Sequence, residues 1–111
     1  MVKVIVLLSR REGMDPEAFA RHARETHLPL VAALPGLRRL VFNHVLPNPD
    51  PHAPPPAYDA VSEDWFDSPE AVAMAFASPA GQAVLADSPN FLDLTRVHWL
   101  VVEEEEFPVG T

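Results

Sequence analysis

The chain has 111 residues, of which 48% are hydrophobic, and a formal net charge of −8. This length suits one domain over residues 1–111, and the hydrophobic content is that of a packed protein. The acidic balance argues against nucleic acid and anionic membranes as partners, because both attract clustered Lys and Arg. The absence of cysteine excludes disulfides, thiolate nucleophiles and cysteine-based metal sites.

The first elements are a strand and a helix. Residues 2–9 are apolar on both alternating faces, as in a strand covered on both sides. This start is too short for a signal segment or membrane span, so we expect a cytoplasmic protein. Asp15 is a good N-cap, and a helix is expected from Pro16 to Thr26 or His27. Pro29 should interrupt this helix and start a second short turn.

Three further strands are expected over residues 37–46, 58–66 and 94–103, the last again apolar on both faces. Residues 47–57 hold six prolines and should form a semi-extended surface loop. Residues 104–111 follow as an acidic tail.

Two short helices fill the interval between the third and fourth strands. Ser68-Pro69 and Ser78-Pro79 each place a capping hydroxyl before a proline at the first helical position. The order β-α-β-β-α-β predicts an α+β, ferredoxin-like fold with a four-stranded antiparallel sheet and its helices on one face. The other face is left bare, so we expect a second copy to cover it in a homodimer.

Ionisable side chains near apolar positions are the candidates for chemistry. His27 falls on the buried stripe of the first helix, while His22 lies roughly 140° away at about 100° per residue. The two histidines should therefore not share a site, and no metal site is expected on this helix. An alternative role for His27 is to contact the free carbonyls at the helix end. His44 and His98 are equally compatible with half-buried strand positions that have only a structural role. Asp64 is either a buried acid with a raised pKa or a solvent-exposed acid at the edge of the sheet.

The whole chain from residue 1 to about 103 resembles the EthD family of the dimeric α/β-barrel superfamily. The resemblance rests on "HLPL" (27–30), "LPGL" (34–37), "YDAVSEDWFDSPEAV" (58–72) and "SPAGQAVLADSPNFLDL" (78–94). It implies a ferredoxin-like monomer, a homodimer whose sheets pack into a barrel, and a pocket between sheet and helices. It points to His27 and then His44 as catalytic residues. The family commonly has a bulky aromatic near position 23, where this chain has Ala23 beside His22.

With this resemblance, the sequence favours an EthD-like enzyme acting on a small hydrophobic carbonyl, lactone or aromatic compound, without metal or organic cofactor. Isomerisation, dehydration and oxygenation all remain open, so the enzyme could be monooxygenase-like (the family's oxidoreductase label) or isomerase- or lyase-like. His27 would be the general acid or base, with a pKa lowered by burial. The expected substrate-binding residues are His22, Phe42, Tyr58, Asp64, Trp65 and Phe76. The alternatives are a non-enzymatic binding protein for a small apolar metabolite and, third, haem binding through His27, His44 or His98.

Overall fold

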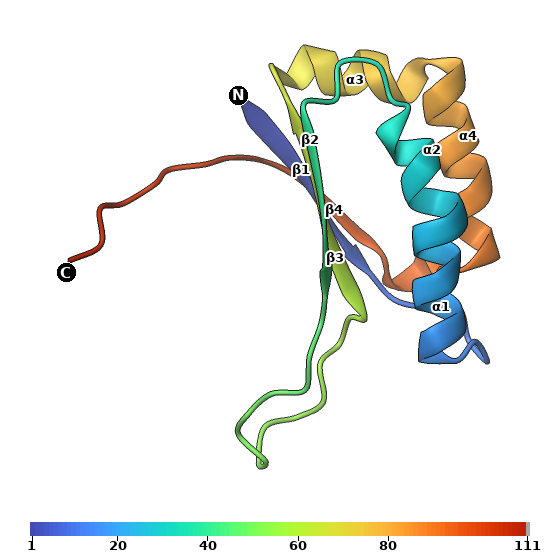
Figure 1. Ribbon diagram of the computed structural model, residues 1–111, viewed down its shortest axis with the longest axis vertical. Helices are drawn as coiled ribbons and strands as arrows, with labels where there is room; N and C mark the ends of the chain where they lie inside the picture. Colours follow the sequence, from blue (N-terminus) through green and yellow to red (C-terminus); the bar gives the residue numbers. More distant parts are fainter. Residues whose placement is uncertain (111) are drawn as a thin grey trace.

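A computed structural model, which describes residues 1–110, contains one four-stranded antiparallel sheet (Figure 1). The strands are β1 (Val2–Leu8), β2 (Arg39–His44), β3 (Ala60–Phe66) and β4 (His98–Glu103), in the order β2-β3-β1-β4. This arrangement confirms the predicted ferredoxin-like α+β fold. The fourth strand is shorter than expected, because Leu94–Arg96 forms a 3-10 turn whose Thr95 N–H is capped by Asp93.

The helices lie on one side of this sheet, and its other side is uncovered (Figure 1). They are α1 (Pro16–His22), α2 (Leu28–Ala32), α3 (Pro69–Ala77) and α4 (Pro79–Asp87). The predicted caps are confirmed, since the side chains of Asp15, Ser68 and Ser78 each accept a hydrogen bond from a backbone N–H in the first turn. The corner between α3 and α4 is tight. A Cβ on Gly81 would lie 2.4 Å from the backbone of Phe76.

The predicted break before Pro29 is wrong, because the chain continues from α1 into α2 through a π-turn, Ala23–His27. In this turn the N–H of Leu28 donates to the carbonyl of Ala23, five residues back. Pro29 has no N–H for a bond four residues back. The wider turn places Pro29 in the first turn of α2, where that N–H is not needed.

The core lies between the sheet and the helices in two clusters. One joins Val4 and Phe66 of the sheet to α2, α3 and α4, and the other joins Leu8 and Ala60 to Phe19 and Phe91. Strand alternation therefore directs Val4, Val6 and Leu8 toward the helices, together with every second residue of the neighbouring strands.

The opposite side, here called the outer face, carries the other set of alternating residues. Its apolar members are Ile5, Leu7, Val41, Val61, Trp65, Leu100 and Val102. Lys3 and Glu63 form an ion pair of 2.7 Å between them, and Asn43 also donates to Glu63. This face is thus apolar with its central charges already paired.

Two segments project beyond the sheet (Figure 1). The chain between β2 and β3 forms no helix or strand, as the prolines of residues 47–57 predicted. Residues 104–110 extend from β4 without regular structure, and Phe107 and Val109 are exposed there.

Candidate functional site

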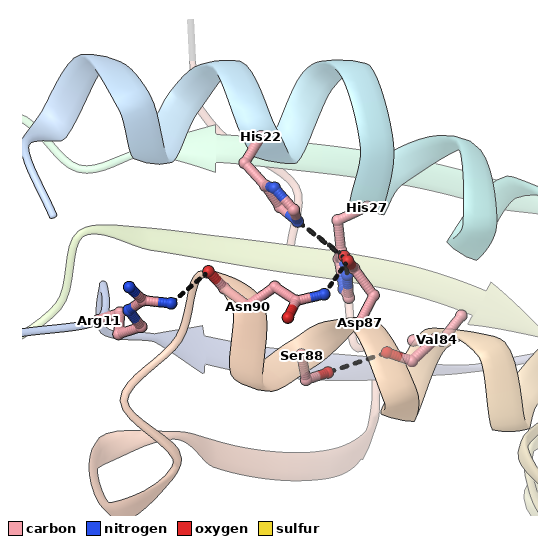
Figure 2. Close-up of polar contacts among 7 residues, drawn as sticks. All are labelled: Arg11, His22, His27, Val84, Asp87, Ser88 and Asn90. Carbon is pink, nitrogen blue, oxygen red and sulfur yellow. Dashed lines mark hydrogen bonds and ion pairs between the residues drawn. The ribbon is translucent and has the colours of Figure 1, made fainter.

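His22 and His27 converge on one carboxylate, that of Asp87 at the end of α4 (Figure 2). His22 Nε2 lies 2.9 Å from Asp87 Oδ2, and His27 Nδ1 lies 2.9 Å from the same oxygen. The prediction that these histidines cannot share a site is therefore wrong. It assumed a regular α-helix, whereas the π-turn between them brings residues five apart onto one side.

Asp87 is held by further contacts. Asn90 Nδ2 donates to its Oδ1 at 3.0 Å, and the ring of Phe91 packs against both histidine rings, with centroids 4.8 Å from His22 and 4.6 Å from His27. Burial acts to raise the pKa of Asp87. The hydrogen bonds from Asn90, His22 and His27 outweigh it and hold that pKa below the usual carboxyl value. Asp87 is thus an ionised, buried acceptor.

This acceptor fixes the protonation pattern of His27. An ionised carboxylate only accepts hydrogen bonds, so Nδ1 of His27 carries the proton that it donates to Asp87. Burial lowers the pKa of His27, as predicted, although Asp87 acts in the opposite direction. At neutral pH the imidazole is therefore neutral, with its lone pair on Nε2.

His27 borders a cavity of about 230 Å³ between the sheet and the helices. Most of the lining is apolar, with contributions from Val6 and Phe42 of the sheet, Val31 of α2, Phe76 of α3 and Val84 of α4. Leu85, Leu94 and Trp99 also border it and are about half exposed, so the cavity opens between α4 and β4. Its size is below the about 300–1,000 Å³ of sites for drug-sized molecules, which suits a compound of about one ring.

Asp64 reaches the same cavity from β3 and is only 3% exposed. Its Oδ1 atom has no hydrogen-bond partner, and desolvation raises the pKa of this carboxyl to about 7. This burial excludes the alternative that Asp64 is a solvent-exposed acid at the edge of the sheet. Ser62, two residues earlier on the same face, and Ser88 of the turn after α4 are the other polar lining groups.

The structure brings together only some of the predicted site residues. His27, Phe42, Asp64 and Phe76 border the cavity, whereas His22 does not and is linked to His27 through their shared partner Asp87. Trp65 does not border it, because alternation places Trp65 on the opposite side of β3 from Asp64. There its ring packs under Lys3 and Arg39, and its Nε1 donates to Glu104.

His44 and Tyr58 also lie apart from the cavity. His44 is exposed at the end of β2, with its ring edge-on to Phe42 at 5.3 Å. Tyr58 packs edge-on against His98 at 5.8 Å and borders the proline-rich loop. Neither side chain is placed to contact a molecule bound beside His27.

Sequence reasoning missed Asp87 and Trp99 as site residues. Asp87 and Phe91 lie within the motif of residues 78–94, but 60 residues separate Asp87 from His27, and no spacing in the sequence links the two. Over residues 1–110, no cluster of three or more His, Asp or Glu side chains is placed to hold a metal ion. In the same range no helix combines the length and the apolar character needed to cross a membrane.

Comparisons with known proteins bear on this arrangement. The model of the EthD domain matches residues 11–95. An uncharacterised 11.0 kDa protein of Rhodococcus erythropolis, from the thcB-thcC intergenic region, is 39% identical over 77 residues, which cover 69% of this chain and 72% of that protein.

Two solved structures share the fold. An EthD-family protein of Bacillus halodurans has a TM-score of 0.81 and 28% identity, covering 95% of this chain and 99% of its own. A dimeric protein of unknown function with a ferredoxin-like fold, from Bacteroides fragilis, has a TM-score of 0.67 and 17% identity, covering 93% and 95%. Because the EthD model spans more than half of the sequence, and the Rhodococcus relative matches more than two thirds of it, this chain belongs to the EthD family.

Proposed function

We propose that this EthD-family chain is an enzyme that performs acid–base chemistry on a small hydrophobic carbonyl, lactone or aromatic compound, with His27 as the base. The observation that carries the proposal is the Asp87–His27 pair at the wall of an apolar cavity. Asp87 orients the ring and stabilises the imidazolium that forms when Nε2 takes a proton. The chain's own residues thus supply a complete proton acceptor.

The cavity lining supports a small apolar substrate. Apolar side chains such as Val31 and Phe76 would exclude water and hold a ring, while a few polar groups fix its orientation. His44 and Tyr58 are not part of this proposal, since neither lies at the cavity. Haem binding is not carried forward either, because a haem is larger than a drug-sized molecule and the cavity is smaller than the sites that hold those.

Replacement of His27 tests the base role. The variants His27→Gln and His27→Ala are assayed with a panel of lactones, phenols and quinones, beside His52→Gln as control, since His52 is exposed in the proline-rich loop. Loss of the base should lower kcat/KM by on the order of 10²–10⁴-fold, with the control unchanged. Unchanged turnover in both His27 variants would reject the role.

A binding protein without catalysis is the alternative, and the two tryptophans separate it from an enzyme. Trp99 borders the cavity, whereas Trp65 lies on the outer face. A ligand in the cavity should therefore quench the fluorescence of a Trp65→Phe variant, which retains Trp99, and leave that of Trp99→Phe nearly unchanged. Quenching of this kind without turnover of any compound of the panel favours the binding protein.

We also propose that the chain forms a homodimer through the outer face. This face is apolar, no helix covers it (Figure 1), and its Lys3–Glu63 pair is already formed, which limits the cost of burying these charges. Light scattering should give the mass of two chains for the wild type and of one chain for Leu100→Lys. The control Leu46→Lys, in the exposed loop, should stay dimeric. A wild type with the mass of one chain would contradict the proposal.

A further inference from the structure

Asp64 stands out among the polar groups of the cavity because nothing in the fold uses it. Among residues 1–110, its Oδ1 is the only buried side-chain nitrogen or oxygen for which the structure gives no hydrogen-bond partner. A buried polar atom without a partner destabilises the folded state by about 1–3 kcal/mol. Such an atom is expected where another molecule supplies the partner.

The surroundings of Asp64 favour the protonated form of its carboxyl below about pH 7. Its cross-strand neighbours are Val4 of β1 and Leu40 of β2, both apolar, and desolvation is the cause of its altered titration. No cationic side chain of residues 1–110 forms an ion pair with it, in contrast to Glu63, the preceding residue, which pairs with Lys3 on the outer face. A carboxylic acid in such a place carries an O–H that it can donate.

Asp64 and His27 border one cavity from opposite layers, the acid from the sheet and the base from the helices. Resting on the proposed function, we infer that Asp64 donates a hydrogen bond to the carbonyl oxygen of the substrate. The substrate class is then a small ketone or lactone with an acidic C–H beside the carbonyl. An acid and a base facing one apolar cavity suit this class, because both ends of the C–H–C=O unit need a polar contact.

The resulting step is an isomerisation that needs no other reactant. His27 Nε2 takes the proton from the carbon beside the carbonyl, the C–H electrons form a C=C bond, and the C=O π electrons move to oxygen. Asp64 stabilises that oxygen through its O–H, as a preorganised donor does for developing negative charge. For a β,γ-unsaturated ketone, the imidazolium then returns the proton to the γ carbon. The product is the conjugated ketone, and both side chains regain their starting state.

The assay uses 3-cyclohexenone, whose conversion to 2-cyclohexenone is followed by ultraviolet absorbance. The full-length protein is used in the assembly state in which it is purified. The variants are Asp64→Leu, which removes the donor, Asp64→Asn, which keeps an N–H donor, and His27→Gln. Asp67→Asn is the matched control. Asp67 lies three residues after Asp64 in the sequence, and it is an exposed acid that pairs with Arg38. Binding of 2-cyclohexenone labelled with ¹³C at its carbonyl is measured separately by NMR.

We expect Asp64→Leu to lower kcat/KM by on the order of 100-fold, like the loss of other donors to a developing oxyanion. The wild-type protein should induce a downfield carbonyl shift in bound 2-cyclohexenone, and this shift should disappear in Asp64→Leu. The urea midpoint of this variant should rise, because the substitution removes a buried polar group without a partner, so the lost shift does not come from unfolding. Asp64→Asn should keep part of the rate but lose the decline of wild-type activity above about pH 7, where the acid ionises.

The outcomes distinguish this inference from the function on which it rests. Equal rates and equal carbonyl shifts for the wild type and Asp64→Leu overturn the role of Asp64 and leave His27 as the base. A fully active His27→Gln that still shows an Asp64-dependent carbonyl shift overturns the base and keeps the donor. A wild type that neither binds nor converts these ketones overturns the inferred substrate class.

Discussion

The buried carboxyl of Asp64 makes a prediction about stability that needs no substrate. Replacement by asparagine keeps the size of the side chain and removes its titration. The unfolded chain ionises Asp64 near pH 3.8, whereas burial raises the folded-state pKa to about 7. Asp64 is only 3% exposed, so little solvent screening reduces this difference.

The sign follows from proton binding. Below about pH 4 the carboxyl is protonated in both states. Between about pH 4 and 7 the folded state keeps the proton that the unfolded state releases, so the wild type loses stability as the pH rises. A pKa higher by about 3 units, at about 1.36 kcal/mol for each, gives a total loss of about 4 kcal/mol, reached above about pH 7.

The measurement is urea unfolding of the wild type and Asp64→Asn at a series of pH values from about 4.5 to 8.5, at one protein concentration. The free energy of unfolding of the variant minus that of the wild type should climb by about 1.4 kcal/mol per pH unit and then level off. Subtraction removes the other groups, including His27, whose lowered pKa reduces stability as the pH falls below about 6.5. Asp67→Asn is the control, because Arg38 lowers the pKa of Asp67, so this carboxyl is ionised in both states over the whole range and the difference for this variant should stay constant with pH. A difference for Asp64→Asn that stays constant with pH would refute the reasoning.

Other variants test the remaining contacts. Asp87→Asn should lower kcat/KM by on the order of 10²–10⁴-fold, because an amide can donate to Nδ1 of His27 and place the ring proton on Nε2. Steady-state rates measure the loss, and the ¹⁵N shifts of His27 report which nitrogen carries the proton. A fully active variant would contradict this prediction. Gly81→Ala should lower the free energy of unfolding by about 1–3 kcal/mol, because its Cβ meets the backbone of Phe76 at 2.4 Å; an unchanged urea midpoint would show that the α3–α4 corner relaxes. Ser68→Ala should cost about 1 kcal/mol through loss of the cap on Ala71 N–H, and a thermal shift below 1 °C would count against that contact.

The fold follows from local patterns in the sequence. A run that is apolar on both faces predicts β1, alternation predicts β3, and a capping side chain before proline predicts the starts of α1, α3 and α4. These signals are short-range, so one sequence suffices to read them. The strand ends are less well predicted, since the 3-10 turn at residues 94–96 depends on Asp93 rather than on the apolar pattern.

The site is only partly readable for two physical reasons. A π-turn leaves the apolar pattern of a helix almost unchanged, so the wrong angle between His22 and His27 follows from a reasonable assumption. The partner of His27 is a tertiary contact to Asp87, for which the sequence carries no spacing rule. Trp65 is a different case, because the alternation that buries Asp64 already directs Trp65 to the outer face.

Binding of a small carbonyl compound between the sheet and the helices, against His27, can be tested with a crystal structure of the wild-type protein soaked with 2-cyclohexenone. We expect ligand density in the cavity beside Phe76, with Nε2 of His27 facing the ring and the ligand oxygen within hydrogen-bond distance of Asp64. Density confined to the outer face, or a His27 ring turned to bulk solvent and separated from Asp87, would contradict the claim.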